Sequence, residues 1–163
     1  MPKECFHISL NESAHIDHRL SKLDLNYIQT GNSIGLGYVF RKGIDVGLLK
    51  ISLEKLLSEL PELAGRLNLK TLSISAQTLS VPFEYVTGVA GKASDFTQRD
   101  TNVTNRTDFV PEPSRRDILR GEGPFMCVRL TEFTGGGSIL GVTINHGLMD
   151  AAGVHLVMHR WSD

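Results

Sequence analysis

The last forty or so residues of the chain constrain the fold most, because two strand patterns and one helical pattern follow each other closely. Pro124–Phe133 and Ser138–Asn145 are rich in apolar and β-branched side chains, and the three glycines between them predict a hairpin loop. Asp150–Trp161 then repeats apolar side chains at the i, i+3, i+4 and i+7 spacing of a helix. A hairpin followed by an amphipathic helix predicts an α/β or α+β architecture, with a mixed β-sheet layered with helices.

A second helix is predicted over Asp45–Leu60, where leucines recur along one face and charged side chains lie largely on the other. Asp45 is the expected N-cap of this helix, because a carboxylate there accepts from free backbone N–H groups. Pro61 is its expected end, because proline lacks an N–H and disfavours helical geometry in the residue before it.

The remaining segments predict further strands and one long irregular stretch. Three strands are expected, over Ser33–Arg41, Leu67–Ile74 and Ser80–Val86. Met1–Leu25 is polar and mixed, and we expect a lead-in there with little core. Thr87–Arg116 is rich in Asp, Asn, Thr, Arg and Pro, which predicts loops, followed by one short helical turn near Asp117–Arg120.

Length and charge exclude several classes of protein. The chain has 163 residues, which fits one domain, and its 17 basic and 18 acidic residues give no surplus for binding nucleic acid or an anionic membrane. No apolar run approaches the ~20 residues of a membrane span, and the start lacks the apolar segment of a secretory signal. Cys5 and Cys127 fit neither a disulfide framework nor a zinc site. We therefore expect a cytoplasmic protein.

The segment Thr143–Gly153 holds the side chains best suited to chemistry. An apolar strand ends at His146, and Asp150 follows four residues later, where the next helix begins. An imidazole, with an ordinary pKa near ~6.5, can accept a proton at neutral pH, and a positioned general base contributes ~100- to 10,000-fold in rate. Two simpler interpretations stay open on this spacing alone. His146 could be a turn residue with a satisfied hydrogen bond, and Asp150 could be an N-cap that accepts from Ala152 or Gly153.

Other catalytic and binding patterns find little support. His155 and His159 lie one helical turn apart and could join His146 or Asp150 around zinc, but the H-E-x-x-H pattern is absent and no cysteine lies nearby. We therefore predict no metal site. The glycines match neither the dinucleotide-binding nor the P-loop spacing, and no serine lies in a G-x-S-x-G elbow.

Three motifs, in the same order and spacing along the chain, resemble those of a known family. They are LSKLD at Leu20–Asp24, LKISLEKLLSELPELAGRL at Leu49–Leu67, and HGLMD at His146–Asp150 with Gly153 and Trp161 after it. Together they resemble the N-terminal half of the BAHD-type acyl-CoA-dependent acyltransferases, the HxxxD transferases. Ala151 departs from the glycine usual after the aspartate, and the DFGWG motif of the family's second lobe has no counterpart here.

The resemblance implies an α/β fold, one lobe of a chloramphenicol-acetyltransferase-like two-lobe fold, with residues 1–163 as a truncated N-terminal lobe. It implies transfer of an acyl group from acyl-CoA to a small-molecule alcohol or amine. Acyl-CoA is then a co-substrate, and no permanently bound cofactor is implied. His146 matches the family's general base. Asp150 matches the aspartate that shapes the site through an ion pair. No nucleic acid or membrane partner is implied. We expect this lobe alone to have little or no acyltransferase activity, and its exposed lobe interface to favour self-association.

Two alternatives remain open. Condensation-type domains of peptide synthesis also use an HxxxD histidine and accept carrier-protein thioesters, but they usually carry two adjacent histidines, whereas Asn145 precedes His146 here. The other alternative is a non-catalytic fragment or interaction module.

Overall fold

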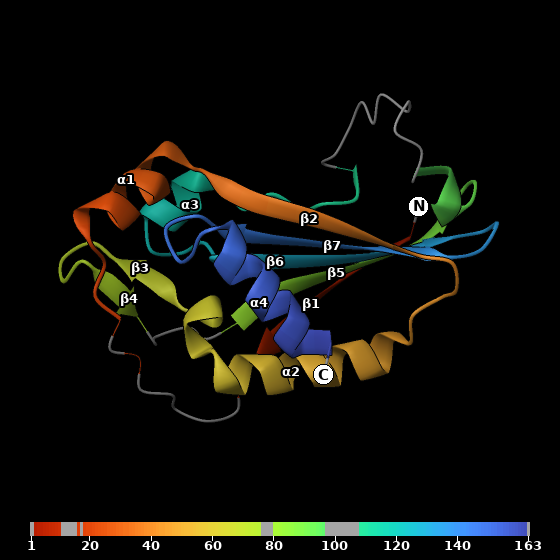
Figure 1. The fold of residues 1–163 in the computed structure, drawn as a ribbon, viewed down its shortest axis with the longest axis horizontal. Coiled ribbons are helices and arrows are strands. Elements are labelled where there is room, and N and C mark those ends of the chain that lie inside the picture. Colours follow the sequence, from red (N-terminus) through yellow and green to blue (C-terminus); the bar gives the residue numbers. More distant parts are fainter. Residues whose placement is uncertain (1, 11–15, 17, 76–79, 97–107, 163) are drawn as a thin grey trace.

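The computed structural model of the chain describes residues 2–10, 16, 18–75, 80–96 and 108–162. Its centre is a five-stranded mixed sheet in the order β1-β5-β6-β7-β2 (Figure 1). These strands are β1 Lys3–Ser9, β2 Ser33–Phe40, β5 Ser80–Val89, β6 Met126–Phe133 and β7 Ser138–Asn145. β5 and β6 are parallel, and the other neighbouring pairs are antiparallel. The predicted mixed sheet layered with helices is therefore confirmed.

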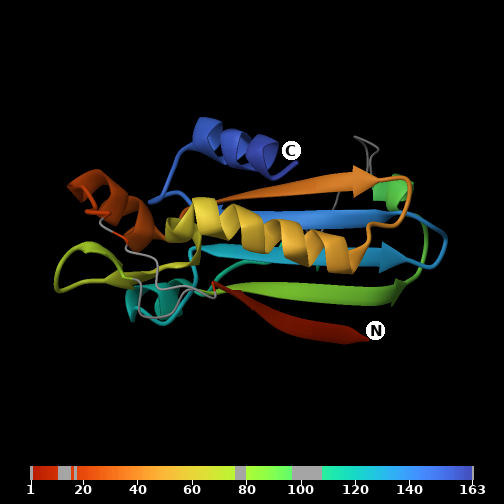
Figure 2. The same cartoon turned by 90° about the horizontal axis from the view of Figure 1, so that it is seen from below.

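Two long helices cover one face of this sheet. They are α2 (Val46–Glu59) and α4 (Ala151–Ser162) (Figures 1 and 2). Leucines of α2 and the side chains of Val154, Val157 and Trp161 on α4 join the strands in the largest buried apolar cluster. Burial of these stripes is what fixes both helices on the sheet.

A group of shorter elements lies at the end of the sheet where β7 finishes. It comprises α1 (Lys22–Thr30), α3 (Arg115–Leu119), the 3-10 turn η1 (Pro61–Ala64) and a small hairpin of β3 (Arg66–Asn68) and β4 (Ser73–Ser75) (Figure 1). A second apolar cluster lies beneath them, with Ile28 of α1, Ile118 of α3 and Phe125 fully buried in it. The remaining short element, η2 (Ala93–Phe96), packs near the far end of β2.

Several sequence predictions are confirmed. The backbone N–H of Leu48 donates to Asp45 Oδ1 at 3.0 Å, so Asp45 caps α2 as expected, and the chain leaves the α-helix at Pro61 to form η1. The hairpin of β6 and β7, the helix α4 and the strand β2 lie within a few residues of their predicted bounds. α3 corresponds to the short helical turn predicted near Asp117–Arg120.

Other predictions are wrong. Met1–Leu25 is not a lead-in: it contains β1, an edge strand with one buried residue, and the start of α1. The single strand expected over Leu67–Ile74 is two short strands, because the chain reverses near Leu72, which has a positive φ of 51°. β5 runs on to Val89, so the predicted loop begins later, and residues 97–107 of it lie outside the described residues. Among the described helices, none is both long and apolar enough to cross a membrane.

Candidate active site

The backbone around His146 is held on both sides by neighbouring segments. β7 is buried along its whole length and ends at Asn145, whose N–H donates to the carbonyl of Phe125 at 2.8 Å. The N–H of His146 donates to the carbonyl of Asn32 at 2.9 Å. Asn145 Oδ1 accepts from the N–H of Gly147 at 2.9 Å, and its carbonyl accepts from Leu148 at 3.0 Å. These hydrogen bonds therefore hold the backbone that carries the imidazole in a fixed position.

The imidazole of His146 is half-buried and presents its two nitrogens differently. Its ring stacks on the ring of Tyr27 from α1, with centroids 4.3 Å apart and planes 14° apart. Nδ1 is buried and has no hydrogen-bond partner, whereas Nε2 is not among the buried unpartnered atoms and makes no hydrogen bond within the described residues. Nε2 is therefore the nitrogen that can take a proton from another molecule.

Asp150 lies at the other end of the same turn, and no hydrogen bond joins it to His146 within the described residues. Its side chain is exposed, and Oδ1 accepts from the N–H of Gly153 at 2.8 Å, while its carbonyl accepts from Val154 at 3.0 Å. It is the N-cap of α4, as one of the sequence interpretations expected. Within the described part of the chain it makes no ion pair, so its contribution to the site here is to fix the turn.

Position 147, directly after the histidine, has room only for glycine. A Cβ at this position would overlap Cγ1 of Ile28 and would lie 2.8 Å from the carbonyl oxygen of Asp24. Both neighbours belong to α1, which is pressed directly against the turn. Any larger side chain would push the helix away, so the glycine permits the close approach that brings Tyr27 onto His146.

The PELAGRL segment that contributed to the resemblance has a structural role in this lobe. Arg66 is 6% exposed, and burial lowers the pKa of its guanidinium. The guanidinium donates to the carbonyl oxygens of Ala64, Gly65, Ser80 and Glu122 and to Ser80 Oγ. These bonds tie η1, β5 and the segment after α3 to one side chain. Arg66 is thus a structural residue, and nothing in its contacts suits it to meet a substrate.

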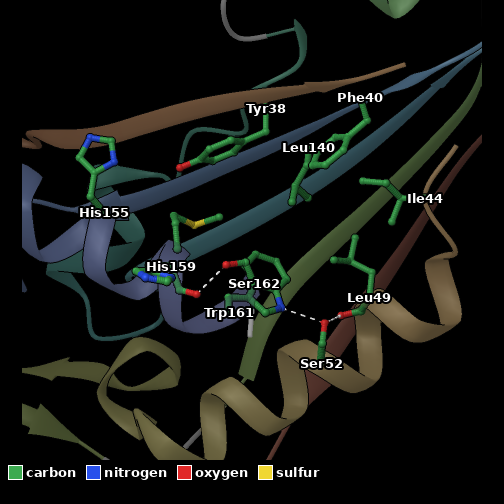
Figure 3. A pocket seen from close by; sticks show the side chains of 11 residues that line it. Tyr38, Phe40, Ile44, Leu49, Ser52, Leu140, His155, His159, Trp161 and Ser162 are labelled. Carbon is green, nitrogen blue, oxygen red and sulfur yellow. Dashed lines mark hydrogen bonds between the residues drawn. The ribbon is translucent and has the colours of Figure 1, made fainter. Parts of the chain in front are cut away.

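A separate cavity of about 590 Å³ lies between the sheet, α2 and α4 (Figure 3). Its walls are mostly apolar, and the indole of Trp161 donates to Ser52 Oγ at 2.9 Å across one side of it. His155 and His159 from α4 line this cavity, and His146 does not. The structure therefore separates the two helical histidines from the turn at His146. No group of three or more potential metal ligands occurs in the described ranges.

The structure thus brings His146 and Asp150 to one turn, as their spacing predicted, and adds Tyr27, which the sequence interpretation did not include. A signal for its helix was present. Ser21 and Asp24 have the S-x-x-D spacing of a capping box, which marks a helix start at Lys22. The contact between Tyr27 and His146 joins residues far apart in the sequence, and no local pattern contains it.

Comparisons with known proteins agree on the architecture. Residues 11–163 match the Transferase family. No curated protein matches the chain. Among solved structures, vinorine synthase superposes with a TM-score of 0.71 at 19% identity, covering 98% of this chain and 42% of that one. The starter condensation domain of the rhizomide synthetase RzmA superposes with a TM-score of 0.62 at 15% identity, covering 88% of this chain and 36% of that one.

A further structure, a variant of the RzmA domain in complex with C8-CoA, gives a TM-score of 0.61 at 16% identity, covering 88% of this chain and 34% of that one. These neighbours have the two-lobe fold of chloramphenicol acetyltransferase, and the mixed sheet with its helices corresponds to it. The chain spans less than half the length of each of these three neighbours.

Proposed function

The chain belongs to the Transferase family of BAHD-type acyltransferases, and from that membership we propose that it supplies the general-base lobe of an acyl-CoA-dependent acyltransferase. The observation that carries the proposal is the way in which the neighbouring segments hold the backbone of His146. A buried strand delivers the imidazole to a rigid turn, and only Nε2 is free to meet another molecule. A general base needs this arrangement, because proton transfer requires a nitrogen within hydrogen-bond reach of the acceptor's proton.

The proposed reaction uses that nitrogen twice. Nε2 of His146 takes the proton from the hydroxyl or amine of the acceptor as its oxygen or nitrogen attacks the thioester carbonyl carbon of acyl-CoA. The new C–O or C–N bond forms a tetrahedral oxyanion, which collapses with cleavage of the C–S bond. The leaving thiolate of CoA then recovers the proton from the imidazolium, so the base is regenerated. Asp150 takes no proton in this scheme, because its carboxylate caps α4 by accepting from the N–H of Gly153.

The lobe described here contributes one wall of such a site. Holding both substrates together accounts for up to ~7–11 kcal/mol of a barrier, whereas a base alone contributes a few kcal/mol, so both walls matter. We therefore propose that turnover by this chain alone is slow. Product should be sought by mass spectrometry after long incubation rather than by an initial-rate assay.

The test is an acyl-CoA assay with a set of alcohol and amine acceptors. We expect an acylated product that disappears in His146→Ala. A matched variant, His155→Ala, removes a histidine that lines the separate cavity and should retain the activity. Activity that survives His146→Ala, or a chain that shows neither turnover nor calorimetric binding of CoA, would contradict the proposal.

The similarity to condensation domains supports one alternative donor, a carrier-protein thioester. Acyl transfer from an acylated carrier protein but not from acyl-CoA would favour it. A non-catalytic interaction module is the other alternative. It would give a stable oligomer on a sizing column and no binding of CoA.

A further inference from the structure

We propose that Tyr27 is the positioning residue for His146, and that the S-x-x-D start of α1 serves to place it there. This inference rests on the proposed function, in which His146 is the base. The two rings lie nearly parallel, with centroids 4.3 Å apart. Since rotation about the last side-chain torsion of histidine is otherwise broad, a parallel neighbour on one face selects the plane of the imidazole.

No hydrogen bond performs this task in the described part of the chain. A histidine base is usually oriented by a group that binds its second nitrogen. Here Nδ1 is buried without a partner, and Asp150, the nearest motif carboxylate in sequence, is bound to the N–H of Gly153. The orientation of the ring must therefore come from packing, and the aromatic ring packed on it is that of Tyr27.

The helix that carries Tyr27 is secured at both ends. At its start, the N–H of Asp24 donates to Ser21 Oγ at 3.2 Å, and the N–H of Ser21 donates to Asp24 Oδ2 at 2.7 Å. At its end, Gly31 adopts a left-handed conformation with φ of 76°, which favours glycine. Arg115 of α3 braces this end by donating from Nε to the carbonyl of Gln29 at 2.5 Å.

The middle of α1 is docked on the histidine turn itself. Ile28 is 1% exposed and closes against Gly147, and it shares an apolar cluster with Leu148. Two neighbouring residues of α1 therefore contact the segment after β7. Ile28 packs against the backbone at Gly147, and Tyr27 stacks on the imidazole of His146. The LSKLD motif, which holds the Ser21–Asp24 capping box, acts by starting the helix that makes these contacts.

The test compares Tyr27→Leu, which removes the ring, with Tyr27→Phe, which keeps it. Leu23→Ala is the matched control, because Leu23 is on the same helix and 61% exposed. NMR signals of the carbon-bound imidazole protons of His146, assigned by their loss in His146→Ala, should show a ring-current shift in the wild type, Tyr27→Phe and Leu23→Ala. The shift should vanish in Tyr27→Leu.

A chemical readout follows the same geometry without any turnover. Diethyl pyrocarbonate should add one group to His146 in the wild type and Tyr27→Phe, because Nδ1 is shielded. In Tyr27→Leu a second group should be added, because the ring can turn. Should Tyr27→Leu fail to fold, Tyr27→Met keeps a flexible apolar side chain without a ring and replaces it in both experiments.

The kinetic readout separates this inference from the proposed function. With both substrates at saturating concentration, we expect Tyr27→Leu to lower the acylated product formed in one long incubation by about 10- to 100-fold, since small misplacement of a base acts on the transition state. Acylation lost in His146→Ala but unchanged in Tyr27→Leu would overturn the role of Tyr27 and leave the base intact. Ring-current and labelling signatures that follow Tyr27 without any acylation would support the positioning and overturn the acyl transfer. Equal effects of Tyr27→Phe and Tyr27→Leu would overturn the stacking.

Discussion

Replacing Arg66 by methionine should destabilise the protein strongly, because the guanidinium is the shared partner of several acceptors that are buried or partly buried. The acceptors are the carbonyl oxygens of Ala64, Gly65, Ser80 and Glu122, at 2.8–3.1 Å, and Ser80 Oγ at 3.2 Å. A buried carbonyl that loses its donor costs about 1–3 kcal/mol. Four carbonyls lose their donor in Arg66→Met, but the variant no longer has to bury a positive charge, which offsets part of that loss. We therefore expect Arg66→Met to lower the free energy of unfolding by about 3–5 kcal/mol. Arg66→Lys should cost about half as much, because one ammonium reaches fewer acceptors.

The assay is urea unfolding followed by the fluorescence of Trp161, the only tryptophan, which is 9% exposed in the folded chain. With a slope of about 2 kcal/mol per molar urea, Arg66→Met should lower the midpoint by roughly 1.5–2.5 M. The matched control is Arg41→Met, which removes an exposed arginine and should change the free energy of unfolding by less than about 0.5 kcal/mol. Midpoints for Arg66→Met and Arg41→Met that agree within error would refute the reasoning.

Three further predictions follow from buried groups. Burial raises the pKa of the Cys127 thiol to about 12, whereas Cys5 is exposed, so a thiol reagent should titrate one thiol in the native chain and two after unfolding. The hydrogen bond to Glu132 raises the pKa of Tyr85 to about 12. The stability that this bond adds to the folded protein is therefore fully present below pH 10, the ordinary pKa of tyrosine, and is lost as the pH rises toward 12. Glu132→Gln should move the absorbance titration of Tyr85 back toward 10. Gly147→Ala should cost about 1–3 kcal/mol in urea unfolding by displacing α1, and an unchanged midpoint would show that the helix shifts without cost.

The elements that the sequence predicted well are those with a regular apolar pattern and with ends that turn or capping residues mark. α2 has its leucine stripe, its N-cap Asp45 and its terminating Pro61, so pattern and punctuation agree. β6 and β7 are mostly or wholly buried, so they appear in the sequence as apolar runs on either side of a glycine loop. The turn from His146 to Asp150 was predictable for the same reason, since the strand before it and the cap after it are both local patterns.

The elements that were missed depend on contacts distant in sequence. β1 buries only Ile8 among its seven residues, so it has no strand pattern of its own and is a strand because it pairs with β5. The sequence predicted loops between β5 and β6 but gave no reason for the length of that connection. β5 and β6 are parallel, so the connection has to return to the other end of the sheet. The stack of Tyr27 on His146 depends on the docking of α1, which no local pattern encodes.

The docking of α1 also sets how long the candidate base stays oriented. A helix of nine residues does not persist alone in water, so α1 exists only while Ile28 and Tyr27 remain seated on the turn. Sub-global opening of this segment requires the loss of fewer contacts than opening of the sheet. Amide exchange along α1 would therefore report the lifetime of the aligned imidazole. On warming, the ring should lose its alignment while the five strands are still paired.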